Sequence, residues 1–132
     1  MTKDIVLAID QGTTGTTVVA VDRNLNVIAK ENQEFRQIFP KPGWVEHDLE
    51  DIWSSTVQTL GAVLARPEVS ADRVAAIGIT NQRETVGLWD RADGRPLHNA
   101  IVWQCRRSVD ICKKLKGSEF EDFARKKTGL LI

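Results

Sequence analysis

The sequence predicts a mixed α/β fold in which helices pack against a sheet. Two apolar runs of strand length, 5–9 and 18–21, flank a loop rich in glycine and threonine, and a third run starts at Val27. A stretch with apolar residues at helical spacing follows, and then a further apolar run, 74–79. Three strands, a helix and another strand in this order favour a mixed sheet with packed helices.

Local signals place each element in the first half of the chain. Polar residues 22–26 form a turn, so the first three strands make an antiparallel meander that runs on through Phe35. Asp48 is placed to cap the helix, which ends before Pro67. The apolar positions of this helix are Leu49, Ile52, Trp53, Val57, Leu60 and Leu64. The run 74–79 has the character of a buried strand.

The second half continues the alternation of strands and helices. Residues 85–89 form a strand, 92–94 form a turn, and two helices are expected beyond Trp103. One face of the first helix carries Val109, Cys112 and Leu115. The second helix opens with residues 118–121, which have the form of a capping box, and closes at Gly129.

Composition excludes several classes of protein. The 132 residues suffice for one domain that buries roughly two-thirds of its unfolded surface. Basic and acidic residues number 18 each, which gives no bulk attraction to nucleic acid or to a membrane. No apolar run reaches membrane-spanning length, and no secretory signal follows Met1. Cys105 and Cys112 are interpreted as reduced thiols, so a cytoplasmic protein is expected.

The loop 10–17 is the first candidate for chemistry. It combines the carboxylate of Asp10 with two glycines and four threonines. Glycine lets backbone N–H groups approach an anion, threonine hydroxyls add donors, and a carboxylate can hold the cation that accompanies a polyphosphate. The loop lacks the lysine of a P-loop and is followed by a strand. Taken alone, it fits a phosphate site and a plain hairpin turn equally well.

A second candidate, 81–84, directly follows the strand 74–79, where ligands of open α/β sheets gather. Arg83 and Glu84 offer donors and acceptors that match the hydroxyls of a polyol, whereas a surface ion pair is the commoner explanation of such a pair alone. The face of Trp103 can pack on the CH groups of a polyol, although a core position is the commoner role for an isolated tryptophan.

Four segments together resemble the glycerol kinases, a branch of the FGGY carbohydrate kinase family. They are 10–14, 42–48, 77–85 and 99–107, in the same order and spacing. The resemblance covers essentially the whole chain and implies a ribonuclease H-like domain of the actin/Hsp70 ATPase type, incomplete here. Residues 1–132 are then expected to be an N-terminal fragment from the first, substrate-binding domain, with the rest of that domain and the second domain absent.

The resemblance also implies a reaction, the transfer of the γ-phosphoryl group of MgATP to glycerol. The residues implied at the nucleotide phosphates are Gly12, Thr13, Thr14, Gly15 and Thr17. Those implied at glycerol are Thr13, Arg83, Glu84 and Trp103. Asp10 is expected near Mg²⁺, through water, because magnesium usually keeps several of its waters. The implied partners are glycerol and ATP, and the full-length protein is expected to be a homo-oligomer.

One departure and one absence qualify this prediction. Glycerol kinases usually carry arginine at the position of Thr17, and a neutral side chain cannot supply that charge. The general base of the family is an aspartate outside this chain, so the isolated chain is expected to be inactive. Two alternatives remain: another polyol or sugar kinase of the family, against which 81–84 argues, and a non-catalytic nucleotide-binding or interaction module.

Overall fold

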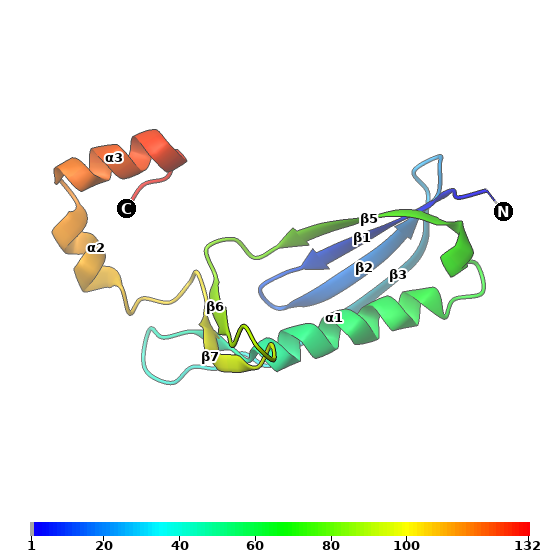
Figure 1. Ribbon diagram of the computed structural model, residues 1–132, viewed down its shortest axis with the longest axis horizontal. Coiled ribbons are helices and arrows are strands. Elements are labelled where there is room, and N and C mark those ends of the chain that lie inside the picture. Colours follow the sequence, from blue (N-terminus) through cyan, green and yellow to red (C-terminus); the bar gives the residue numbers. More distant parts are fainter. Residues whose placement is uncertain (1) are drawn as a thin grey trace.

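The computed structural model describes residues 2–132 and shows the predicted mixture of sheet and helix (Figure 1). The elements are β1 (Ile5–Gln11), β2 (Gly15–Val21), β3 (Val27–Glu34), β4 (Glu46–His47), α1 (Leu49–Leu64), the 3-10 turn η1 (Ala71–Arg73), β5 (Val74–Asn81), β6 (Val86–Trp89), β7 (Pro96–Ile101), α2 (Val109–Leu115) and α3 (Glu119–Thr128). The strands form a four-stranded sheet, β3-β2-β1-β5, and a three-stranded sheet, β4-β7-β6. Figure 1 shows α1 along one face of the larger sheet, and α2 and α3 extending away from it.

The larger sheet contains the predicted antiparallel meander of β1, β2 and β3. β5 adds to it in parallel with β1, after α1 has carried the chain across one face of the sheet. In this register Asp10 lies beside Thr80, and Gln11 lies beside Asn81. The parallel pairing therefore places the loop after β1 and the turn after β5 at the same edge of the sheet.

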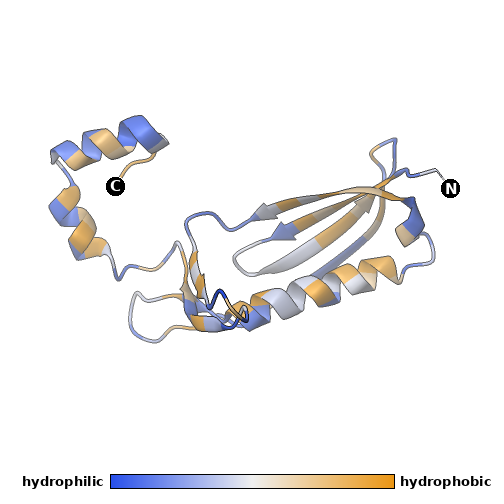
Figure 2. Ribbon diagram, viewed as in Figure 1, coloured by the Kyte–Doolittle hydropathy of each residue, from blue (hydrophilic) through white to orange (hydrophobic). Residues whose placement is uncertain are grey.

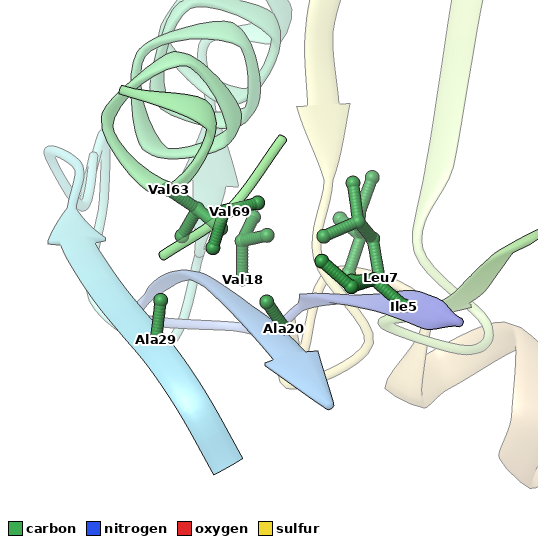
Figure 3. Close-up of a cluster of buried hydrophobic side chains, with 8 residues drawn as sticks. Ile5, Leu7, Val18, Ala20, Ala29, Val63 and Val69 are labelled. Atoms are coloured by element: carbon green, nitrogen blue, oxygen red, sulfur yellow. The ribbon is translucent and has the colours of Figure 1, made fainter. Parts of the chain in front are cut away.

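The hydrophobic core lies between α1 and the larger sheet. Its buried members are Ile5, Leu7, Ile9, Val18, Ala20, Ala29, Val63 and Val69. Figure 3 shows Val63 and Val69 gathered with Val18 above the sheet, with Ile5 and Leu7 on the neighbouring strand. Every second residue of β1 is buried, as expected for a strand with one covered face.

The cap of α1 was predicted correctly, but its buried face only in part: Leu49 is buried, and Leu60 and Leu64 pack against the core. Asp48 accepts a hydrogen bond from the Glu50 backbone N–H at 2.9 Å. The residues buried against the sheet include Ser55, Thr59 and Val63, whereas Trp53 is 66% exposed. Small side chains on this stripe fit against the sheet, and a 2.8 Å hydrogen bond joins Ser55 Oγ to Thr16 Oγ1 of β2.

The expectation that 74–79 is a buried strand was wrong for the described chain. β5 is an edge strand, and Ile77 and Ile79 are 52% and 72% exposed. α1 packs mainly on β2 and β3, so it does not cover this edge. The strand is nevertheless strongly apolar in composition, as its colouring shows (Figure 2).

The smaller sheet was only partly predicted. β6 falls within the expected strand 85–89, but β4 and β7 were missed. β7 begins with a proline and has no regular apolar alternation, and β4 has only two residues. Both strands are therefore defined by their pairing with each other rather than by a local pattern.

The two expected C-terminal helices are present. Ser118 is the N-cap of α3, but the predicted capping box does not form, because the Ser118 side chain makes no cap bond and Glu121 accepts from the N–H of Gly117, before the cap, at 2.6 Å. Gly129 ends the helix in the left-handed conformation, with φ of 75°. Among residues 2–132, no helix is both long and apolar enough to cross a membrane.

Gly15 allows β2 and β3 to approach closely, because a Cβ atom there would lie 2.5 Å from the Gln33 carbonyl oxygen. We expect Gly15→Ala to lower the free energy of unfolding by about 1–3 kcal/mol in urea titrations, since the strands must separate. Gly61→Ala is the matched control, because a Cβ on this residue of α1 meets no atom within 4 Å. The control should stabilise the chain by up to about 1 kcal/mol. Equal effects of the two substitutions would contradict the close approach.

Candidate functional site

A cavity of about 310 Å³ lies where the loop after β1 meets the turn after β5. Its lining residues are Gly12, Thr13, Asn81, Gln82, Arg83, Glu84 and Trp103. The structure thus brings together Thr13 from the predicted phosphate loop and the three other residues implied at a polyol. These residues come from segments that are far apart in the sequence, and the β1–β5 pairing is what makes the loop and the turn neighbours.

The turn that carries Arg83 and Glu84 has the features of a binding site rather than of a surface ion pair. Both side chains are exposed, and neither forms an ion pair within residues 2–132. Glu84 has a positive φ of 59°, a conformation that is uncommon for residues other than glycine. Such backbone strain is often retained at ligand-binding positions. The geometry therefore favours the binding interpretation.

Trp103 is not a core residue, because it is 54% exposed. Its indole Nε1–H donates to Thr13 Oγ1 at 3.0 Å, and its backbone N–H donates to Thr85 Oγ1 at 3.3 Å. The indole is thus fixed at its polar edge while much of its surface stays free for a ligand. An aromatic face beside Arg83 and Glu84 suits a small molecule with CH groups and several hydroxyls.

A buried ion pair holds the segment that carries Trp103. Glu46 of β4 is 5% exposed. It accepts from the Arg107 guanidinium at 2.6 Å and from Asn99 Nδ2 at 3.0 Å. The hydrogen bond from Arg107 outweighs burial and holds the pKa of Glu46 below its ordinary value. Arg107 also lies 3.9 Å from the ring centroid of Trp44, in a cation–π contact.

A chain of buried polar side chains lies behind the cavity, and sequence reasoning missed it. His47 is fully buried, with Nε2 2.7 Å from Gln37 Oε1 and Nδ1 3.4 Å from Gln82 Nε2. Gln37 Nε2 in turn donates to the Thr13 carbonyl at 3.1 Å. These partners assign the Nε2–H tautomer of a neutral ring, and burial lowers the pKa of His47 from its ordinary value.

His47 lies within the motif segment 42–48, but no feature of the sequence assigns His47 or Gln37 a role in a site. His47 stands between a glutamate and the helix-capping Asp48, and Gln37 lies in an irregular segment. Their roles depend on Gln82, which is distant from both in sequence. Only the tertiary arrangement shows that the three side chains meet.

Asp10 and Thr17 do not line the cavity described above. They line a second cavity of about 530 Å³ with Lys30 and Thr80 among its other residues. The burial alternation of β1 puts Asp10 on the sheet face opposite to α1. Thr17 Oγ1 accepts from Asn32 Nδ2 at 2.8 Å. Within residues 2–132 no cluster of three or more His, Cys, Asp or Glu side chains is placed to hold a metal, so Asp10 is a single carboxylate.

Two further residues of the predicted loop lie outside both cavities. Thr14 is exposed, and its carbonyl accepts from the Phe35 backbone N–H at 3.3 Å. Gly15 is buried against the backbone of β3. The structure thus shows a packing reason for this glycine that is independent of any phosphate.

The neutral state of His47 makes stability sensitive to acid. Burial lowers its pKa below the ordinary 6.5, so the folded chain binds fewer protons at this ring than the unfolded chain does. The contribution of His47 to the free energy of unfolding should be constant well above pH 6.5 and should fall below it, by up to about 1.4 kcal/mol per pH unit. Denaturant titrations between about pH 7 and pH 5 measure this loss.

The same titrations on two variants isolate the contribution of His47. His47→Gln should remove most of the acid-dependent loss, because the titrating group is gone. His98→Gln, at the exposed histidine of β7, should retain it. A His47→Gln profile parallel to that of the unsubstituted chain would contradict the assignment.

Comparisons with known proteins agree with this architecture. Residues 5–132 match the model of the FGGY family of carbohydrate kinases, N-terminal domain. The chain is 52% identical over 130 residues to a glycerol kinase of Salmonella arizonae, covering 98% of this chain and 26% of that protein. A glycerol kinase of Salmonella newport gives the same identity and coverage. The chain thus spans about a quarter of the length of these relatives.

Solved structures show the same fold. Plasmodium falciparum glycerol kinase with ADP is 36% identical, with a TM-score of 0.83 over 98% of this chain and 26% of that one. A ligand-bound xylulose kinase from Lactobacillus acidophilus, at 24% identity, has a TM-score of 0.83 over 95% of this chain and 25% of its own. The predicted actin/Hsp70-like α/β fold is therefore confirmed. Because the family model matches nearly the whole sequence, the chain belongs to the FGGY family of carbohydrate kinases.

Proposed function

We propose that the chain forms part of the substrate-binding domain of an ATP-dependent glycerol kinase. The enzyme would transfer the γ-phosphoryl group of ATP to a terminal hydroxyl of glycerol, giving glycerol 3-phosphate and ADP. The observation that carries this proposal is the cavity that places Arg83, Glu84 and Trp103 beside Thr13. The identity to the Salmonella glycerol kinases supports the choice of substrate. The general base and the adenine pocket would come from residues outside this chain.

The polyol side of the cavity fits glycerol. Each hydroxyl of glycerol can both donate and accept, so it needs partners of both kinds. Arg83 supplies N–H donors that have no acidic partner within residues 2–132, and Glu84 supplies acceptor oxygens. Trp103 would pack against the carbon chain. Together these groups hold the triol in one orientation, with a terminal hydroxyl toward the phosphate side.

The phosphate side of the cavity is formed by the loop after β1. Thr13 Oγ1 accepts from the Trp103 indole, so the proton of the threonine hydroxyl remains available to a phosphate oxygen. Thr13 and Thr14 would bring backbone donors to the nucleotide phosphates. The Gly12 N–H donates to the Gly15 carbonyl at 2.9 Å, so Gly12 would serve by leaving room beside the phosphates, with Gly15 and Thr17 at the base of the loop. Phosphoryl transfer depends mainly on positioning and on charge stabilisation, which this arrangement provides only in part.

Magnesium would accompany the nucleotide rather than bind a dedicated protein cage. A single carboxylate, Asp10, fits an ion that keeps most of its waters and takes its other ligands from phosphate. The ion would neutralise charge on the transferring group. Asp10 would hold the hydrated ion through water-mediated hydrogen bonds.

Another polyol or a sugar remains the main alternative substrate, since known structures of this fold include a gluconate kinase and xylulose kinases. The uncharged Thr17 supports a further alternative, a nucleotide-binding module without catalytic activity. Comparing glycerol, erythritol and xylulose as substrates of the full-length protein separates these cases. The balanced charge and the free Cys105 and Cys112 agree with a cytoplasmic enzyme. The family resemblance suggests a homo-oligomer.

Arg83→Ala tests the polyol site in the full-length enzyme. Loss of the charged hydrogen bonds should lower kcat/KM for glycerol by about 1.5–3 kcal/mol, or roughly 10- to 150-fold, with little change in the KM for ATP. Steady-state kinetics with a coupled ADP assay measure both constants. Arg91→Ala, at an exposed arginine of the turn after β6, is the matched control and should leave them unchanged. Unchanged glycerol kinetics in Arg83→Ala would remove Arg83 from the site.

A further inference from the structure

We propose that Gln82 is a positioning residue that fixes the phosphate-side loop relative to the polyol-side turn. This inference rests on the glycerol kinase activity proposed above and adds a residue that holds the two halves of the site together. Gln82 directly precedes Arg83 in sequence, and its side chain hydrogen-bonds both to the loop after β1 and to Thr85 of its own turn. It is therefore connected to both halves at once.

The amide nitrogen of Gln82 holds the loop after β1. Nε2 donates to Gln11 Oε1 at 3.1 Å and to the Gly12 carbonyl at 3.3 Å. The Gly12 carbonyl belongs to the same planar peptide unit as the Thr13 N–H, so fixing one fixes the direction of the other. Gln82 thereby sets the orientation of a backbone donor in the proposed phosphate site.

The amide oxygen of Gln82 is fixed by Thr85, three residues further along the same turn. Thr85 Oγ1 accepts from the Trp103 backbone N–H at 3.3 Å, so its single proton is directed to Gln82 Oε1 at 3.0 Å. This bond decides which way the amide faces and turns its NH₂ group toward Gly12. The Trp103 indole Nε1–H in turn donates to Thr13 Oγ1 at 3.0 Å, on the phosphate side. The hydrogen bonds form a closed ring around the cavity.

His47 connects Gln82 to a second support of the same loop. Gln37, its partner on Nε2, donates to the carbonyl of Thr13, so the peptide unit that follows Thr13 is also held. Both peptide units that flank Thr13 are thus fixed by glutamine side chains, and one buried imidazole joins these glutamines. An edge-on contact with Phe35, with ring centroids 5.0 Å apart, holds the imidazole in place.

This arrangement predicts an effect on rate rather than on binding. Removing Gln82 leaves Arg83, Glu84 and Thr13 chemically intact, so each substrate keeps its own contacts. Their relative placement becomes looser, and a misplacement of about 1 Å can cost about 100-fold in rate.

Gln82→Met in the full-length enzyme tests the proposal, because methionine keeps the length of the side chain and removes its hydrogen bonds. We expect kcat to fall at least about tenfold, with the KM values for glycerol and ATP within about threefold of the unsubstituted enzyme. Gln58→Met is the matched control and should keep full activity, since Gln58 is exposed on α1 and, within residues 2–132, its side chain bonds only Gln33 and Ser54. An unchanged kcat, or a raised KM with kcat retained, would overturn the positioning role.

If Gln82→Met does not fold, a pair of smaller substitutions at Thr85 tests the positioning role instead. Thr85→Val removes the hydroxyl that orients the Gln82 amide and should also lower kcat, whereas Thr85→Ser keeps the hydroxyl and should restore it. In the double variant Gln82→Met with Thr85→Val, the rise in activation free energy calculated from kcat should be smaller than the sum of the rises in the two single variants. Equal activity of the Thr85→Val and Thr85→Ser variants would contradict the closed ring of hydrogen bonds around the cavity.

The activity of the unsubstituted full-length enzyme distinguishes a failure of the proposed function from a failure of the proposed role of Gln82. If the enzyme does not phosphorylate glycerol, the proposed function fails and the role of Gln82 fails with it. If it is active and Gln82→Met is unimpaired, only the role of Gln82 is overturned.

Discussion

The parallel pairing of β1 with β5 is the constraint on which the rest of the candidate site depends. It sets Gln11 beside Asn81, so the two segments that continue past the sheet leave it at the same edge. From there Gln82 can reach the Gly12 carbonyl, 3.3 Å away. A different register would separate the loop from the turn, and the hydrogen bonds around the cavity could not close. The helix α1 makes this pairing possible, because it crosses one face of the sheet and returns the chain parallel to β1.

The segment that follows the smaller sheet adds the third wall of the cavity, through Trp103. β4 and β7 pair with each other, and the buried Glu46–Arg107 ion pair fastens the segment that follows β7. Trp103 lies in that segment, so its position depends on an ion pair that makes no contact with the ligand site itself. Buried pairs of this kind often contribute more to a defined arrangement than to net stability. Here the defined arrangement is the contact between an indole and the Thr13 hydroxyl.

Features encoded by neighbouring residues could be predicted from the sequence, and features that arise from distant contacts could not. The meander and the Asp48 cap follow from periodicity and local hydrogen bonding, and the structure contains both. The buried stripe of α1 contains the small polar residues Ser55 and Thr59 rather than Trp53, because the choice of face depends on the fit to β2. In the same way, the motif residues of the cavity were identifiable by resemblance, whereas the role of His47 required the fold.

The proposed function requires Arg83, Glu84 and Trp103 to form a polyol site beside Thr13. Crystals of the full-length enzyme, grown without glycerol and then soaked in it, would reveal where glycerol binds. We expect glycerol in this cavity, with hydroxyl oxygens within about 3.2 Å of the Arg83 guanidinium and the Glu84 carboxylate, and with its carbon chain on Trp103. Glycerol bound at another place, with Arg83 paired to a protein carboxylate, would contradict it.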